Sequence, residues 1–163
     1  MRFTFFLLFL VVFISGCIKE PHVYTKQHSA LMVLRTPTMH YAYQGFIYEG
    51  EDKIKIEIYE NGQALFSLYI TQDTVCSGMF NCINKASLNE QALSPFYPDN
   101  IIENIFRGQP LMDGKNVVKE DNGFTQKLTN GNKYNIVYSV LNHEMTFHDT
   151  INHIVMKIKK SKG

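Results

Sequence analysis

Side chains suited to metal binding or proton transfer gather near the C-terminus, at His143-Glu144, His148-Asp149 and His153. A zinc peptidase places two histidines four residues apart, because that spacing brings both imidazoles to one face of a helix. Here the spacing from His143 is five, in a segment with the pattern of strand and turn, so the rings point to opposite faces. We expect ordinary turn and surface histidines, with a metal-dependent site at His143, His148 and His153 as the alternative.

Other catalytic motifs do not occur in the sequence. It contains no Gly-x-Ser-x-Gly nucleophile elbow, phosphate-binding loop, dinucleotide fingerprint or paired-carboxylate motif. Its 163 residues hold 16 Lys and Arg against 15 Asp and Glu, so the basic excess that nucleic-acid binding demands is missing. We therefore expect a protein that is not an enzyme, has no cofactor or bound metal and does not bind nucleic acid.

Cys17 follows a short apolar leader. Residues 3–14 are uncharged and, as a helix, rise only about 18 Å, less than the roughly 30 Å hydrocarbon core of a bilayer. That length is typical of a signal peptide. The segment Ile14-Ser15-Gly16-Cys17 resembles a bacterial lipobox, in which the cysteine sulfur receives a diacylglycerol before the signal peptide, here 1–16, is cleaved. The alternative is an ordinary signal peptide followed by a chance cysteine.

The lipobox resemblance implies a lipoprotein that is anchored to a membrane by fatty acids such as palmitate on Cys17. Two or three acyl chains anchor stably, since burial contributes about 0.8 kcal/mol per CH₂. Residue 18 is Ile, not the Asp that holds lipoproteins at the inner membrane in well-studied Gram-negative species. We expect the bacterial outer membrane at its periplasmic face, with a Gram-positive cell surface as the alternative.

Cys76 and Cys82 remain after the leader is removed, and disulfides persist outside the cytoplasm. The five residues between them, with Gly78, can return the chain to bonding distance. We predict a disulfide that stabilises the fold by about 2 kcal/mol. Two free thiols, or a metal or redox pair, are the alternatives, although no Cys-x-x-Cys is present and no His lies within ten residues of either sulfur.

The elements that must position these groups are strands, two short helices and further strands. Residues 17–29 are polar and predict a tether, followed by one β-rich domain over 30–163. Strands are expected over 30–35 and 42–49, and residues 53–59 alternate polar and β-branched side chains as a half-buried strand does. We predict a mainly β (α+β) fold: a curved antiparallel sheet or half-barrel with two short helices in the middle of the chain.

The turn after residues 53–59 is predicted from the faces of the flanking strands. A two-residue loop at Asn61-Gly62 would leave the aliphatic side chains of the second strand beside charges. A three-residue loop, 60–62, with Gly62 left-handed in a G1 bulge, places them on one face. We expect this loop, with Ile58 opposite Ala64, Ile56 opposite Phe66 and Ile54 opposite Leu68.

The helical region contains two start signals. Ser87 and Glu90 have the form of a capping box for a helix that Ser94-Pro95 ends, and Asp99 is the expected cap of a second helix that Gly108 ends. The apolar stripe of the second helix and one face of the predicted hairpin form the candidate apolar face: Ile54, Ile56, Ile58, Phe66, Leu68, Ile101, Ile105 and Phe106.

The order of elements behind the lipobox resembles that of the LolB-type outer-membrane lipoprotein receptors and their LolA-type carrier relatives. Residues 101–110 resemble the short helix ending in Gly-x-Pro that precedes the last strands of that family. The resemblance covers 42–159 by element order, while the chain is shorter and has no Trp. It implies an incompletely closed sheet, covered by helices, whose apolar concave face holds the acyl chains of a lipoprotein in transit; no individual ligand-binding residue carries over.

Two functions fit these patterns. The first is a membrane-anchored envelope lipoprotein that binds acyl chains or lipoproteins in a LolB-like half-barrel, for which seven Met and nine Tyr supply an adaptable lining. The second is a structural or assembly lipoprotein that binds another envelope protein, with the apolar face filled by its own helices. Inhibitors of host enzymes and undetected enzymes are further alternatives.

The lipobox makes a direct prediction for Cys17. Cells expressing the Cys17→Ala variant should incorporate no radiolabelled palmitate into the protein, because the acyl acceptor is gone. A variant with both Cys76→Ser and Cys82→Ser should keep the label. Label on the Cys17→Ala variant would show that the assigned lipidation site is wrong.

Overall fold

The computed structural model describes residues 24–78 and 80–161, so the predicted signal peptide and Cys17 lie outside the described residues. The first half contains β1 (Lys26–Arg35), β2 (His40–Glu49), β3 (Ile54–Glu60), β4 (Gln63–Ile70), β5 (Thr74–Ser77) and β6 (Asn81–Asn84). Two short helices follow, α2 (Lys85–Ala92) and α3 (Ile101–Arg107), and then a 3-10 turn, η2 (Met112–Gly114). The last strands are β7 (Val117–Glu120), β8 (Gly123–Asn130), β9 (Tyr134–Leu141), β10 (Glu144–Asp149) and β11 (Ile154–Lys160).

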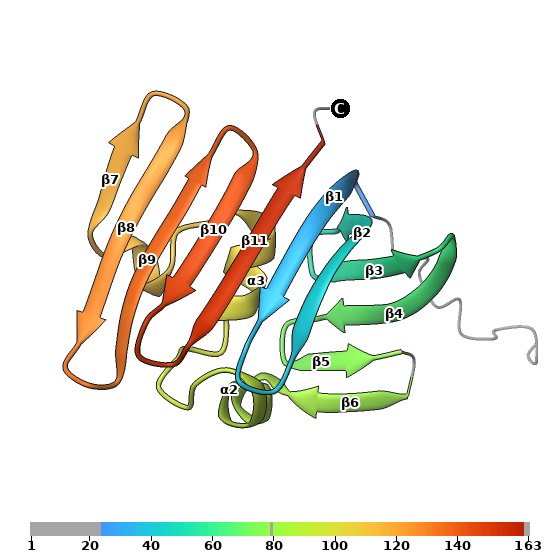
Figure 1. Cartoon of the computed structure of the whole chain (residues 1–163), viewed down its shortest axis with the longest axis horizontal. Coiled ribbons are helices and arrows are strands. Elements are labelled where there is room, and N and C mark those ends of the chain that lie inside the picture. The colour runs from blue at the N-terminus through green and yellow to red at the C-terminus, as the bar shows by residue number, and fades with distance from the viewer. Residues whose placement is uncertain (1–23, 79, 162–163) are drawn as a thin grey trace, which may run out of the picture.

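The eleven strands of the described residues form one antiparallel sheet in the order β6-β5-β4-β3-β2-β1-β11-β10-β9-β8-β7 (Figure 1). The sheet stays open, since β6 and β7 are its two edges. The predicted mainly β fold, with a curved antiparallel sheet and two short helices in the middle of the chain, is confirmed. Because β1 begins at Lys26, the last four residues of the expected tether belong to the sheet.

The two halves of the sheet meet where the first strand pairs with the last. β1 and β11 are antiparallel neighbours over six residue pairs, from Ala30 opposite Lys160 to Arg35 opposite Val155. Beyond β2 the strands β3 to β6 run across the direction of β1 and β11 (Figure 1). One continuous sheet thereby wraps around a concave face.

Gly45 lies in β2, where the sheet changes direction. A Cβ atom at this position would lie 2.0 Å from the carbonyl oxygen of Glu57 on β3 and 2.6 Å from Cε of Met32 on β1. Glycine in a strand interior often marks such a close approach of backbones or a bend in the sheet. The absence of a side chain at Gly45 therefore allows β2 and β3 to pack tightly while Met32 lies over them.

The hydrophobic core lies on the concave side of the sheet. Ile136 and Tyr138 on β9, Phe147 on β10 and Ile154 on β11 are completely buried. Tyr97, from the loop between the helices, packs edge-to-face on Phe147 with ring centroids 5.9 Å apart. The loop between α2 and α3 is thus fixed onto the C-terminal strands.

The expected turn between β3 and β4 is wrong. Asn61 and Gly62 alone form it, with φ of 51° and 79°, and Glu60 pairs with Gln63. Positive φ at both central residues matches the twist of the flanking strands, which favours a two-residue turn. A bulge at Leu65 then restores the aliphatic face, so that face is as predicted while the partners differ: Ile54 lies opposite Ile70, Ile56 opposite Leu68 and Ile58 opposite Phe66.

Both expected helix starts are also wrong. α2 begins at Lys85, and Asn84 is its cap, with Oδ1 accepting a 2.7 Å hydrogen bond from the backbone N–H of Ser87. The capping-box prediction failed because β6 leads directly into the helix. α3 is preceded by Asn100, not by Asp99, and has no side-chain cap. Its predicted end is confirmed, since Gly108 is left-handed with φ of 70°.

The predicted disulfide between Cys76 and Cys82 is present. The two cysteines lie opposite each other on β5 and β6. The bond therefore joins neighbouring strands close to the tip of their hairpin.

Replacement of Gly45 by Ala should destabilise the protein by about 3 kcal/mol, the upper end of the usual cost of overpacking, because the added methyl group meets backbone at Glu57. Urea unfolding followed by circular dichroism measures this. The neighbouring substitution Gln44→Ala, at an exposed position of the same strand, should change stability by less than about 0.5 kcal/mol. Equal stability of the two variants would contradict the close approach at Gly45.

Candidate ligand-binding cavity

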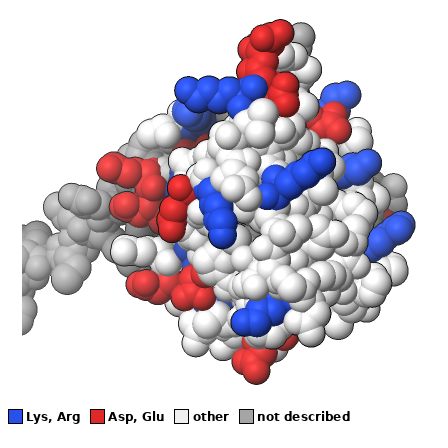
Figure 2. Space-filling view, turned by 90° about the vertical axis from the view of Figure 1, so that its left-hand side faces the viewer, with Lys and Arg blue, Asp and Glu red and all other residues white. Residues whose placement is uncertain are grey.

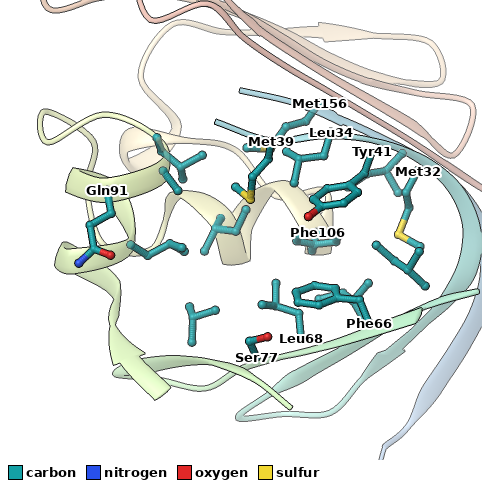
Figure 3. A pocket seen from close by; sticks show the side chains of 18 of the residues that line it. Met32, Leu34, Met39, Tyr41, Phe66, Leu68, Ser77, Gln91, Phe106 and Met156 are labelled. Carbon is teal, nitrogen blue, oxygen red and sulfur yellow. The ribbon is translucent and has the colours of Figure 1, made fainter. Parts of the chain in front are cut away.

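A cavity of about 400 Å³ lies between the concave face of the sheet and the two helices (Figure 3). Side chains of β1, β3, β4 and β11 line one side of it, and side chains of α2 and α3 line the other. In Figure 3, Phe66 and Leu68 lie across the cavity from Met39 and Leu34. The protein's own side chains thus leave part of its concave face unfilled.

Part of the candidate apolar face borders the cavity, and the rest lies in the packed core. Five of its members line the cavity: Ile56, Ile58, Phe66, Leu68 and Phe106. The other three, Ile54, Ile101 and Ile105, do not line the cavity and lie wholly within the packed core. The candidate face is therefore divided between a binding surface and ordinary core.

Several lining residues were missed by sequence reasoning. Met32 and Leu34 on β1, Met39 and Tyr41 near the β1–β2 turn, and Met156 on β11 all border the cavity. The inward direction of Met156 could be predicted from strand alternation. Its place beside Met32 and Leu34 follows only from the β1–β11 pairing, which joins strands more than 100 residues apart in sequence.

The lining is apolar and carries no ionisable acid, base or histidine side chain among the described residues. Its polar groups belong to Tyr41, Ser77, Asn81 and Gln91, all of which are exposed and mark the opening. Three methionines add side chains that adjust readily to the shape of a ligand. Figure 2 shows Lys and Arg side chains, with Asp and Glu mostly at the rim, around a largely uncharged face on the β7 side.

The helices that cover the cavity are joined by a group of charged side chains. Lys85 of α2, which is only 4% exposed, donates a 2.8 Å hydrogen bond to Glu103 of α3. Glu103 also accepts a 3.0 Å bond from Nε of Arg107. The other guanidinium nitrogens of Arg107 donate to the carbonyl oxygens of Gly50 and Glu51, both at 3.0 Å. This network ties α2 to α3 and α3 to the β2–β3 turn.

The ionisation of Glu103 is set by two opposing effects. Burial raises the pKa of the carboxyl, but the hydrogen bonds from Lys85 and Arg107 outweigh burial and hold that pKa below its ordinary value. The carboxylate therefore stays ionised to lower pH than in the unfolded chain. Its contribution to stability is present above the ordinary Glu pKa of about 4.3 and is lost as the pH falls through the lower folded value.

Asp149 belongs to a structural network. It is completely buried, and Oδ2 accepts a hydrogen bond from the hydroxyl of Tyr97, while Oδ1 accepts one from the backbone N–H of Asn135 at 3.0 Å. Burial raises the pKa of this carboxyl, but these bonds and one from Asn152 outweigh it and lower the pKa. Burial and the bond to Asp149 raise the pKa of Tyr97. Asp149 thus holds the α2–α3 loop on the C-terminal strands.

Of the three histidines near the C-terminus, His148 lies on β10, and His143 and His153 lie at opposite ends of that strand. His143, with φ of 66°, precedes β10, whereas His153, with φ of 55°, lies in the turn after it. β10 separates them by six strand residues, roughly 20 Å at the usual rise. Within residues 24–78 and 80–161, no three His, Cys, Asp or Glu residues are arranged to hold a metal ion.

No helix in the described part of the chain is long and apolar enough to cross a membrane. Comparison with known proteins finds no matching family model and no matching curated protein, so no function is transferred from a relative.

The substitution Glu103→Gln should lower the free energy of unfolding by about 3 kcal/mol at pH 7, because it leaves the buried ammonium group of Lys85 without its carboxylate. The difference from the unmodified protein should shrink as the pH falls below about 4, where Glu103 becomes protonated in both folded and unfolded states. Urea unfolding at a series of pH values measures both effects.

The matched control is Glu90→Gln, which removes an exposed carboxylate from α2. It should change stability by less than about 0.5 kcal/mol at every pH. A stability loss for Glu103→Gln that stays constant between pH 7 and pH 3 would contradict the role assigned to the ionised carboxylate.

Proposed function

We propose that this protein is a non-enzymatic envelope lipoprotein that binds acyl chains in a LolB-like half-barrel. The cavity between the sheet and the helices is the observation that carries the proposal. Its volume of about 400 Å³ lies within the 300–1,000 Å³ range of small-molecule sites. A core that serves only stability has few voids larger than a water molecule.

The chemistry of the lining supports an aliphatic ligand. Each methylene group moved from water into such a site contributes about 0.8 kcal/mol, and no buried charge in the lining opposes its entry. A charged ligand group inside the cavity would find no counter-ion among the described lining residues. The chain of the ligand is therefore placed inside and its polar end outside.

The opening supports the same orientation. Ser77, Asn81 and Gln91 are exposed lining residues of the cavity, and Tyr41, which also lines it, is 40% exposed. These hydroxyl and amide groups can hydrogen-bond the ester or amide that links an acyl chain to a larger molecule. We place the linkage at this opening.

The proposal includes the cellular location of the protein. A lipid on Cys17 would anchor it, in our assignment at the periplasmic face of the bacterial outer membrane. The Cys76–Cys82 disulfide supports an oxidising compartment. The partners under this proposal are the membrane and an acyl chain, free or carried by a lipoprotein.

The substitution Ala92→Phe tests the site, because Ala92 of α2 lines the cavity and a phenyl group there would occupy part of its volume. In a Cys17→Ala background, which keeps the protein free of its own lipid, a fluorescent fatty-acid probe should bind the variant at least tenfold more weakly. The control Ala42→Phe places the same ring at an exposed position of β2 and should bind normally.

Mass spectrometry of the purified Cys17→Ala protein should also find co-purified lipid. A lipid-free protein that binds no probe would contradict acyl-chain binding. That result would favour the alternative, an assembly lipoprotein, whose protein partner cross-linking in the envelope should trap.

A further inference from the structure

Phe80 is the most exposed of the large hydrophobic side chains in the described residues, with 93% of its surface accessible. It lies at the tip of the β5–β6 hairpin, between Ser77, where β5 ends, and Asn81, where β6 begins. Single exposed apolar residues are common on protein surfaces and need no explanation by themselves. The surroundings of Phe80 make this one different.

The strands that lead to the tip are fixed to each other and to β4. The Cys76–Cys82 disulfide joins the strands directly below it, and the backbone N–H of Gly78 donates a 2.9 Å hydrogen bond to the carbonyl oxygen of Ser67 on β4. A flexible loop could fold an apolar side chain back onto the protein. Here the clamped hairpin presents the ring of Phe80 to solvent.

The hairpin is also uncharged. From Thr74 to Asn84 the sequence contains no Asp, Glu, Lys or Arg. The flanking Lys85 is turned inward to Glu103. On the adjacent strand β4, two residues before Ser67, Leu65 is 50% exposed. The apolar surface of the tip can therefore be buried without the cost of desolvating a charged side chain.

The tip borders the opening of the cavity. Ser77 and Asn81, on either side of it, both line the cavity, and Figure 3 places Ser77 at its edge below Leu68. Anything that binds Phe80 is thus brought next to the opening. The further link to Cys17 is covalent: the seven residue steps from Cys17 to Tyr24 span at most about 25 Å.

We propose that the Phe80 tip inserts into the surface of a lipid bilayer and so brings the cavity opening to the membrane. A bilayer fits better than a protein partner because the tip offers a projecting aromatic ring without charges to steer or orient a partner. Insertion of one ring contributes a modest free energy, which a lipid anchor would supplement by keeping the domain near the membrane; in the unanchored protein a high concentration of vesicles takes the place of the anchor. The inference uses the proposed anchor but does not require that the cavity is occupied.

The absence of Trp from the chain makes a direct test possible. In the Cys17→Ala background, Phe80→Trp introduces a unique fluorophore at the tip. With vesicles of phosphatidylethanolamine and phosphatidylglycerol, its emission should shift to shorter wavelength, and brominated lipids should quench it. The control Phe96→Trp, at a 50% exposed position in the loop between the helices, should show neither change.

A second variant measures the contribution of the ring. Phe80→Ser should lower vesicle partitioning at least about tenfold, as expected for loss of a buried phenyl group, while Phe96→Ser leaves it unchanged. Fatty-acid probe binding in solution should be normal for Phe80→Ser, which separates this inference from the proposed function. Unshifted emission of the Phe80→Trp variant with vesicles, or a shift that depends only on protein concentration, would overturn membrane insertion; the latter would indicate self-association.

Discussion

The antiparallel pairing of β1 with β11 is the interaction on which the rest of the structure depends. It joins a half-sheet from the beginning of the chain to a meander from its end, and makes one open sheet of eleven strands in the described residues. Without this pairing, Met32 and Met156 would not share a surface, and the helices would have no continuous concave face to cover. Gly45 then lets the sheet change direction beside this seam, because its missing Cβ allows β2 and β3 to approach closely.

In this domain apolar side chains form the core, and ion pairs hold the two helices in place. Where α3 lies on the sheet, Ile54, Ile101 and Ile105 close the core completely. Nearer α2 the same face stays hollow, and the helices are held by the ion pairs of Glu103 with Lys85 and Arg107. Because these ion pairs hold α2 and α3 in place, the helices do not need to fill the cavity with their side chains. That arrangement leaves an apolar cavity inside a stable fold.

Local sequence patterns predicted much of this architecture. Alternation identified the inward face of β3, and the short Cys76–Cys82 loop predicted its disulfide. The details of turns and caps were less predictable because alternative local solutions cost similar free energies. The β3–β4 turn combines a two-residue loop with a bulge and reaches the same face as the expected three-residue loop. Asn84 caps α2 because β6 ends at this residue and the helix begins directly after it. The capping-box pattern at Ser87 and Glu90 contains no information about where β6 ends.

The sequence by itself determined the class of the fold and the aliphatic face of β3, and it favoured the pairing of the two cysteines, since all of these depend on residues close together in the chain. Tertiary structure alone decided which part of the candidate face stays hollow. Ile56 and Ile101 are equally apolar in sequence and both are only 1% exposed, yet Ile56 borders the cavity and Ile101 does not. The difference is the distance between packed elements, and that distance is set by strand pairing and helix placement over more than 100 residues.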